Sequence, residues 1–198
     1  MVLHDSITLA SASPRRRELL NQIGIPHEVR PADLDESRLG DEPPEDYVRR
    51  LACAKAAAVW DRHPGRPVLA ADTAVVLAGE LFGKPRDLKD CVRMLSALSG
   101  RTHQVLTAVA VRHSGGAADA LSVSEVTLRA LSSAECTRYW HTGEPAGKAG
   151  GYAIQGRAAT FISGLRGSYS GVMGLPLAET AGLLAGAGVR MWNTGAGN

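Results

Sequence analysis

The sequence predicts an α/β protein organised around a mixed β-sheet. Segments typical of strands alternate with segments typical of helices along all 198 residues. Neither an internal repeat nor a clear linker divides the chain, and its length suffices for one good-sized core. We therefore expect a single domain over residues 1–198, which could be bilobed, with a frayed tail at 193–198.

The first part of the chain is expected to form a strand followed by two helices. The apolar run 7–10 predicts the strand. Ser13 and Pro14 are typical of the N-cap and the first position of a helix. After a polar, acidic stretch at 31–45, the spacing of apolar side chains predicts a longer helix over 44–62.

The remainder of the chain is expected to be richer in strands. The predicted elements are a strand at 67–77 with a hairpin into 81–82, a helix at 87–98, strands at 103–112 and 120–131, a helix from 132 or 133, and a final helix from 176. The glycine-rich region 143–174 is expected to hold short strands rather than helices.

Composition argues against several classes of protein. The chain is 44% hydrophobic and 21% charged, as in ordinary soluble globular proteins. No apolar stretch approaches the length of a membrane span and residues 1–20 do not resemble a signal peptide, so we expect a cytoplasmic protein without a membrane partner. Cys53, Cys91 and Cys136 are scattered and odd in number, which favours buried small side chains over a disulfide or zinc framework. A net charge of +2 is too small to indicate a nucleic-acid partner.

Positive charge gathers at the start of the first predicted helix. Arg15, Arg16 and Arg17 lie in or near its first turn, where cations oppose the helix dipole at a cost of about 0.3–1 kcal/mol each. Backbone N–H groups at the same end, with the hydroxyls of Ser11 and Ser13, make a natural phosphate site. Three solvated arginines that fray the helix are the alternative. The segment is not a Walker loop, because it lacks the spaced glycines and the Gly-Lys-Ser/Thr end.

Two charged residues stand where apolar ones are expected. Asp72 interrupts the run 67–77, so its carboxylate should be at least partly buried and should need a cation, hydrogen bonds or a metal. It either faces a ligand crevice, as strand-end carboxylates often do, or forms a bulge or turn with Thr73. Lys55 falls on the apolar row of its helix, where it either meets a negative partner or, more commonly, snorkels outward.

Other polar residues carry weaker signals. Lys84 follows the hairpin and Glu36 lies in an acidic loop, and both kinds of position are usually solvated. Gln155 lies among glycines that permit close approach of a ligand but serve tight turns equally well. His103 falls within a predicted strand and is expected to be structural. No Gly-X-Ser-X-Gly motif is present to support a serine hydrolase.

Together, these residues lie in segments that resemble the Maf family of nucleotide pyrophosphatases. The run Leu-Ala-Ser-Ala-Ser-Pro-Arg-Arg-Arg-Glu-Leu-Leu at 9–20 is similar to the opening signature of that family. Further similar segments, in chain order, are 47–52 with 55–56, 71–73, 83–85, 98–103, 167–169 and 174–177. The resemblance thus covers nearly the whole chain. Ala74 is smaller than the β-branched residue expected there, a change in packing that leaves the resemblance standing.

The resemblance implies a fold and a reaction. Maf proteins are elongated, with a twisted mixed sheet flanked by helices and a cleft between two lobes, similar to the inosine triphosphate pyrophosphatases. They hydrolyse the α–β phosphoanhydride of nucleoside triphosphates with help from a divalent cation. By resemblance Asp72 is the proton acceptor, and Glu36 and Asp72 would hold Mg²⁺ or Mn²⁺. The groups expected to bind the phosphates are Ser11, Ser13, Arg16, Lys55 and Lys84.

The resemblance also indicates a substrate. Segments 152–156 and 167–176 are similar to the branch that acts on dTTP and UTP, and differ from the branch that takes 7-methyl-GTP. Arg15, Thr73 and Gln155 match positions associated with substrate choice, and a glutamine amide offers a pyrimidine both a donor and an acceptor. Modified pyrimidine triphosphates are a second candidate substrate.

Two further expectations concern partners and role. Because the family name derives from septum formation, the alternative function is a regulator of cell division that binds nucleotide or nucleic acid without essential catalysis. The low net charge and the lack of aromatics among the basic residues disfavour nucleic acid as its partner. A homodimer is expected because members of the family often form dimers.

Overall fold

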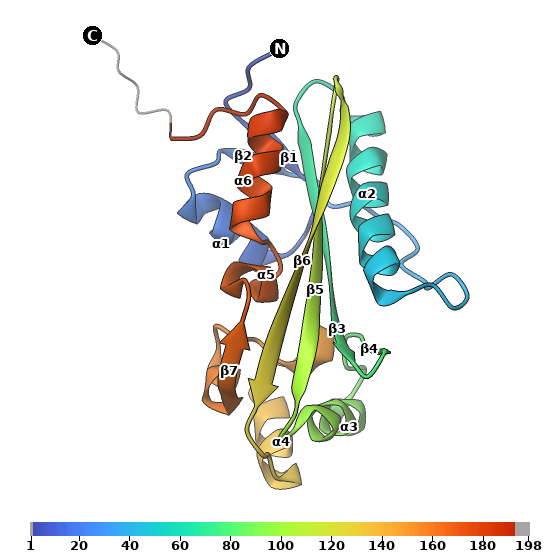
Figure 1. The fold of residues 1–198 in the computed structure, drawn as a ribbon, viewed down its shortest axis with the longest axis vertical. Helices are drawn as coiled ribbons and strands as arrows, with labels where there is room; N and C mark the ends of the chain where they lie inside the picture. Colours follow the sequence, from blue (N-terminus) through green and yellow to red (C-terminus); the bar gives the residue numbers. More distant parts are fainter. Residues whose placement is uncertain (1, 193–198) are drawn as a thin grey trace. The chain divides into compact units, whose positions relative to one another are not determined.

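The computed structural model describes residues 2–192, and its central feature is a mixed β-sheet (Figure 1). Within the described residues the sheet has seven strands in the order β2-β1-β3-β5-β6-β7, with β4 paired to β3. The strands are β1 (Ile7–Leu9), β2 (His27–Val29), β3 (Val68–Leu77), β4 (Glu80–Phe82), β5 (Thr102–His113), β6 (Gly116–Leu128) and β7 (Ile162–Arg166). β1 pairs with β2 and β3 in parallel, whereas the β3–β4 and β6–β7 pairs are antiparallel. The predicted α/β class with a mixed sheet is confirmed.

Helices begin where the sequence places suitable caps. They are α1 (Pro14–Gln22), α2 (Pro44–Arg62), α3 (Leu88–Leu98), α4 (Ser133–Trp140), α5 (Tyr169–Met173) and α6 (Leu177–Gly186), with short 3₁₀ turns η1 (Ala149–Gly151) and η2 (Arg157–Phe161). The Asp87 side chain accepts a hydrogen bond from the N–H of Asp90 at 2.8 Å, which satisfies one unpaired donor at the start of α3. Ser132 and Glu135 form a reciprocal capping box that begins α4.

None of the helices in the described part of the chain is both long enough and apolar enough to cross a membrane.

The chain divides into two compact units. Of the described residues, unit 1 takes 2–72, 107–121 and 174–192, and unit 2 takes 73–106 and 122–173. β3, β5 and β6 each contribute residues to both units. The single domain, the elongated shape and the cleft between lobes stay predictions, and the tail predicted at 193–198 lies outside the described residues.

Unit 1 packs aliphatic side chains of α1 and α2 with those of the neighbouring strands. Ile7, Leu9, Leu20, Leu51 and Leu69 are at most 1% exposed. Burial of each such side chain stabilises the fold by about 1.5–3 kcal/mol before conformational entropy is counted. Two backbone hydrogen bonds of 2.9 Å join His4 to the segment after α6. The predicted site residues of this unit therefore lie beside a buried aliphatic core.

Unit 2 has a core of its own beneath α3 and α4, which lie side by side (Figure 1). Leu95 and Leu98 of α3 pack there with Tyr139 of α4 and with Phe161. The rings of Tyr139 and Phe161 meet edge to face, with centroids 5.1 Å apart. This arrangement is among those that aromatic pairs prefer.

Three local predictions need correction. The glycine-rich region 143–174 contains η1, η2 and α5 besides one strand. These helical elements are only three to five residues long, so the glycines do not prevent them. At the start of α5, Ser168 Oγ accepts a hydrogen bond from the N–H of Gly171. Strand β2 was not predicted, since its three residues are too few to show a period. Cys91 and Cys136 are buried as expected, but Cys53 is exposed because it lines a cavity beside α2 instead of packing into the core.

Candidate functional site

Lys55 is the centre of the charged cluster in unit 1. The residue is 7% exposed on the buried face of α2. Its Nζ donates to Oδ1 of Asp72 at 2.7 Å and lies 2.6 Å from Oε1 of Glu36. The commoner expectation, that the lysine snorkels outward, is therefore wrong, because two carboxylates supply the charge that a buried ammonium needs.

Asp72 lies in the interior of β3 and is 8% exposed. The strand continues from Val68 to Leu77, so Asp72 stands neither at a strand end nor in a turn, and it accepts a hydrogen bond from the side chain of Lys55. Burial raises the pKa of Asp72, Lys55 and Arg16 oppose that rise, and Glu36 adds to it. The result is a carboxylate that accepts a proton more readily than a solvated aspartate does.

The start of α1 brings a guanidinium and hydroxyls into the same unit. Arg16 donates from Nη1 to Ser11 Oγ at 3.0 Å and from Nε to the carbonyl of Gly174 at 2.7 Å. Burial lowers the pKa of Arg16 and the charge of Asp72 opposes that effect. Ser13 occupies the N-cap position, but its hydroxyl makes no capping hydrogen bond, and its N–H donates to Ser11 Oγ at 3.2 Å. Arg15 follows in the first turn, half-buried, and burial lowers its pKa as well.

Two residues of α2 that the sequence reasoning did not assign hold the loop that carries Glu36. Tyr47 donates its hydroxyl to the backbone carbonyl of Glu36 at 3.0 Å. Arg50 donates to both carboxylate oxygens of Glu42, at 2.7 and 2.8 Å, and to the carbonyl of Ser37 at 3.1 Å. Tyr47 and Arg50 are three positions apart on the helix and therefore share a face. A tyrosine and an arginine three positions apart on a helix that follows an acidic loop were the only sequence features that could have indicated this role.

The other predicted site residues belong to unit 2. Thr73 follows Asp72 in β3 and is half-buried, Lys84 follows β4 and is exposed, and Gln155 is exposed in the loop before η2. The structure thus brings Glu36, Lys55 and Asp72 into direct contact. The proximity of Thr73, Lys84 and Gln155 to that cluster stays a prediction.

The donor set of the cluster suits one mode of metal binding. Mg²⁺ is usually held by one or two carboxylates together with water and substrate phosphates. Glu36 and Asp72 supply two carboxylates within reach of one ammonium. In the described part of the chain, no group of three or more His, Cys, Asp or Glu side chains could hold a metal ion by itself. The residues therefore fit a cation that arrives with a phosphate-bearing substrate.

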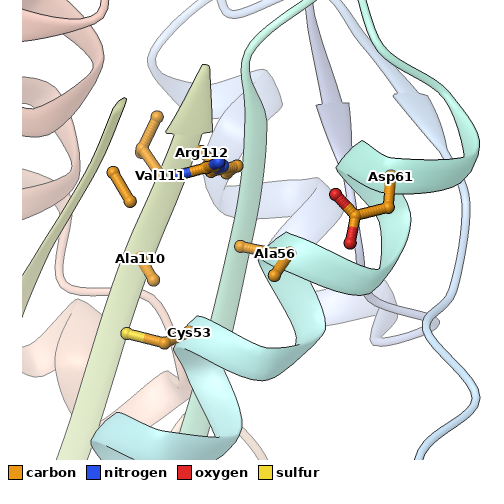
Figure 2. Close-up of a pocket in the computed structure, with 8 residues that line it drawn as sticks. Cys53, Ala56, Asp61, Ala110, Val111 and Arg112 are labelled. Atoms are coloured by element: carbon orange, nitrogen blue, oxygen red, sulfur yellow. The ribbon is translucent and has the colours of Figure 1, made fainter. Parts of the chain in front are cut away.

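A cavity of about 330 Å³ lies elsewhere in unit 1, between α2 and β5 (Figure 2). Its lining is formed by Cys53, Ala56, Ala57, Asp61, Ala110, Val111, Arg112 and Ala117. Cys53 and Lys55 are two positions apart on α2 and so point about 200° apart around the helix. The lining includes none of the predicted site residues, and the cavity is separate from the charged cluster.

His103 belongs to the scaffold of unit 2, as expected. It is 2% exposed, and its Nε2 is hydrogen-bonded to the hydroxyl of Tyr152 at 2.7 Å. Its Nδ1 is buried and has no hydrogen-bond partner among the described residues. Burial lowers the pKa of His103 to about 4, so the ring is neutral at physiological pH.

Comparison with known proteins places these residues in a family context. The model of a family described as "Maf-like protein" matches residues 6–187. A protein of Anaeromyxobacter dehalogenans strain 2CP-C, named dTTP/UTP pyrophosphatase, is 57% identical over 92% of this chain and 94% of its own length. A protein of the same name from Cupriavidus pinatubonensis is 51% identical over 95% of this chain and 100% of its own. Among solved structures, the Staphylococcus aureus Ham1 protein matches 62% of this chain and 71% of its own, with a TM-score of 0.47 at 14% identity.

Proposed function

Because the chain belongs to the Maf family, we propose that it hydrolyses dTTP and UTP to the monophosphate and pyrophosphate. Relatives at 51% and 57% identity over more than nine-tenths of the chain carry the name of that activity. The observation that carries the proposal is the contact of the buried Lys55 ammonium with the buried carboxylate of Asp72 and the exposed carboxylate of Glu36. Such a group of opposed charges, with a perturbed pKa, is typical of a site that does chemistry.

Asp72 is the general base of the proposed reaction. Its carboxylate takes a proton from water as the water oxygen attacks the α-phosphorus. The bond from that phosphorus to the oxygen bridging to the β-phosphorus breaks, and pyrophosphate leaves with the bond electrons. The raised pKa of Asp72, caused first by burial, makes the carboxylate a stronger proton acceptor than a solvated aspartate.

Cationic groups neutralise the triphosphate, which carries three to four negative charges. In the proposal Arg15, Arg16, Lys55 and Lys84 contact phosphate oxygens, with Ser11, Ser13 and the N–H groups at the start of α1. When bound, Mg²⁺ or Mn²⁺ held by Glu36 and Asp72 supplies further charge neutralisation. Lys55 already lies against both carboxylates, so it is well placed to balance charge before and after substrate binds.

The base of the nucleotide is selected by Gln155, with Thr73 and Arg15. Gln155 is exposed, and its amide can donate one hydrogen bond and accept another along a pyrimidine edge. A site built to make such bonds rejects bases whose donors and acceptors are exchanged. Cytoplasmic location, a homodimer, a role in cell division and the lack of a nucleic-acid partner stay predictions.

A pyrophosphate-release assay tests the function. The wild-type protein is incubated with dTTP, UTP, CTP, GTP, ATP and modified pyrimidine triphosphates, with Mg²⁺, with Mn²⁺, and with a chelator. We expect release from dTTP and UTP that stops when the metal is removed. A higher kcat/KM for a modified pyrimidine would identify that nucleotide as the better substrate. Release from none of the triphosphates would overturn the proposal.

A further inference from the structure

Glu144, in the loop after α4, makes an unusually complete set of hydrogen bonds in unit 2. Its Oε1 accepts the hydroxyl proton of Tyr139 at 2.7 Å and the N–H of Ala158 at 3.2 Å. Its Oε2 accepts the N–H of Arg157 at 2.9 Å. Three donors on one half-buried carboxylate fix its position more firmly than a surface ion pair does.

These bonds hold one particular segment, the turn that carries Gln155. On one side of Gln155, the N–H of Ala153 donates to the hydroxyl oxygen of Tyr139 at 3.2 Å. On the other side lie the two N–H groups bound by Glu144. The N–H of Gly156 donates to the carbonyl of Ala153 at 3.0 Å and closes the turn. Tyr139 and Glu144 therefore grip the backbone both before and after Gln155.

Most residues of this turn are buried, but Gln155 is exposed to solvent. Tyr152, Ala153, Ile154 and Ala158 are buried, whereas Gln155 is exposed. Gly156 passes so close to the carboxylate that a Cβ at this position would lie 2.4 Å from Oε2 of Glu144. Glycine is thus required for the backbone to reach the anchor, and any side chain would push Glu144 away.

We propose that Glu144 and Tyr139 are positioning residues for pyrimidine selection, which fix the turn from which the Gln155 amide meets the base. The inference rests on the proposed function. A glutamine amide distinguishes uracil from cytosine only if its donor and acceptor are held in the correct order, because the two bases exchange a carbonyl for an amino group. A backbone pinned on both sides of Gln155 supplies that constraint without contact between the anchor and the substrate.

The test is Glu144→Gln, assayed with UTP and CTP. The new amide group would face the N–H of Arg157 or Ala158, so one anchoring bond becomes a clash between donors. We expect the ratio of kcat/KM for UTP to that for CTP to fall roughly 10-fold, mainly through a higher KM for UTP. Amide exchange of Ala153, Arg157 and Ala158 should also quicken, which reports on the anchor independently of activity.

Two further variants and one control complete the experiment. Gly156→Ala and Tyr139→Phe should shift the ratio in the same direction, and either serves if Glu144→Gln does not fold. Glu125→Gln is the matched control, because Glu125 belongs to the same unit and its ion-pair partner, Arg166, is 3.8 Å away. An unchanged UTP-to-CTP ratio in folded variants, or an equal loss of kcat for both nucleotides, overturns the inference alone. A wild-type protein that cleaves no triphosphate overturns the proposed function instead.

Discussion

Asp72 in unit 1 is buried and Glu144 in unit 2 is half-buried, and the two carboxylates are stabilised by different partners. Asp72 accepts a hydrogen bond from the charged ammonium of Lys55, whereas Glu144 accepts from a tyrosine hydroxyl and two backbone N–H groups. Burial raises the pKa of Asp72. Burial acts in the same direction on Glu144, but its hydrogen bonds from Tyr139, Arg157 and Ala158 hold its pKa below the usual range. Glu144, saturated by fixed neutral donors, serves as an anchor, whereas Asp72 keeps the capacity to take a proton because burial outweighs the opposing effect of Lys55 on its pKa.

The largest effect is expected from removing the proposed base. Asp72→Asn keeps the shape of the side chain but cannot accept a proton from water, so kcat for dTTP should fall roughly 10²–10⁴-fold. Steady-state pyrophosphate release measures this loss, and thermal unfolding should show that the variant is folded. Asp61→Asn, on the exposed side of α2, is the control and should remain active. Near wild-type turnover by Asp72→Asn would remove Asp72 from the chemistry.

Removal of the buried cation should destabilise the fold, besides weakening the proposed phosphate binding. Lys55→Met leaves Asp72 buried without its 2.7 Å partner, and breaking a buried pair in this way costs about 3–5 kcal/mol. Urea unfolding of Lys55→Met, with the exposed Lys89→Met as control, measures the difference in the free energy of unfolding. The double variant Lys55→Met with Asp72→Asn should recover part of the loss, because the buried carboxylate is gone and only the exposed Glu36 loses its partner. Strictly additive effects would contradict a direct coupling between the two side chains.

Acid should weaken unit 2 through His103. The pKa of His103 is lowered to about 4 in the folded protein, so the unfolded chain, with a histidine pKa near 6.5, binds the proton first. Stability is therefore complete above pH 6.5 and declines as the pH falls toward 4, by at most about 3 kcal/mol. His103→Gln should flatten this part of the pH profile of urea unfolding. A profile that His103→Gln leaves unchanged would assign the acid sensitivity to other groups.

The smallest effect is expected at the start of α4, the helix that carries Tyr139. Ser132→Ala removes the hydroxyl that accepts the N–H of Glu135 at 3.3 Å and should cost about 1 kcal/mol of stability. Ser133→Ala, one position further along, is the control and should change little. Thermal unfolding detects the difference. A loss of pyrimidine selectivity in Ser132→Ala comparable to that of Glu144→Gln would mean that the anchor depends on the whole helix.

The sequence predicted most of the fold because its local signals agree with the global structure. The bounds of α2 are those expected from the apolar period, and Ser13, Asp87 and Ser132 begin the helices they were expected to begin. β2 and α5 were not anticipated because elements of three to five residues show no period and depend on tertiary contacts. The family expectation, which the family model and the relatives confirm, came from ordered motifs rather than from any single residue.

The sequence predicted which residues belong to the candidate site better than it predicted which of them contact one another. Lys55 and Asp72 were conspicuous because charge interrupts an apolar pattern, but spacing alone did not pair them across 17 positions. The sequence predicted no role for Tyr47 or Glu144, because a tyrosine or a glutamate near a loop is common in any protein. Their roles become visible only in the structure, where each forms hydrogen bonds with backbone groups of a segment distant in sequence.

The exposed thiol in the cavity wall has a practical consequence. Cys53 is exposed while Cys91 and Cys136 are buried, so a thiol-reactive fluorophore should attach at one position of the unmodified chain. Partial burial raises the pKa of the Cys53 thiol, and labelling should therefore proceed faster in mildly alkaline buffer. Because this side of α2 points away from Lys55, the dye would report on unit 1 during nucleotide titration while leaving the charged cluster untouched.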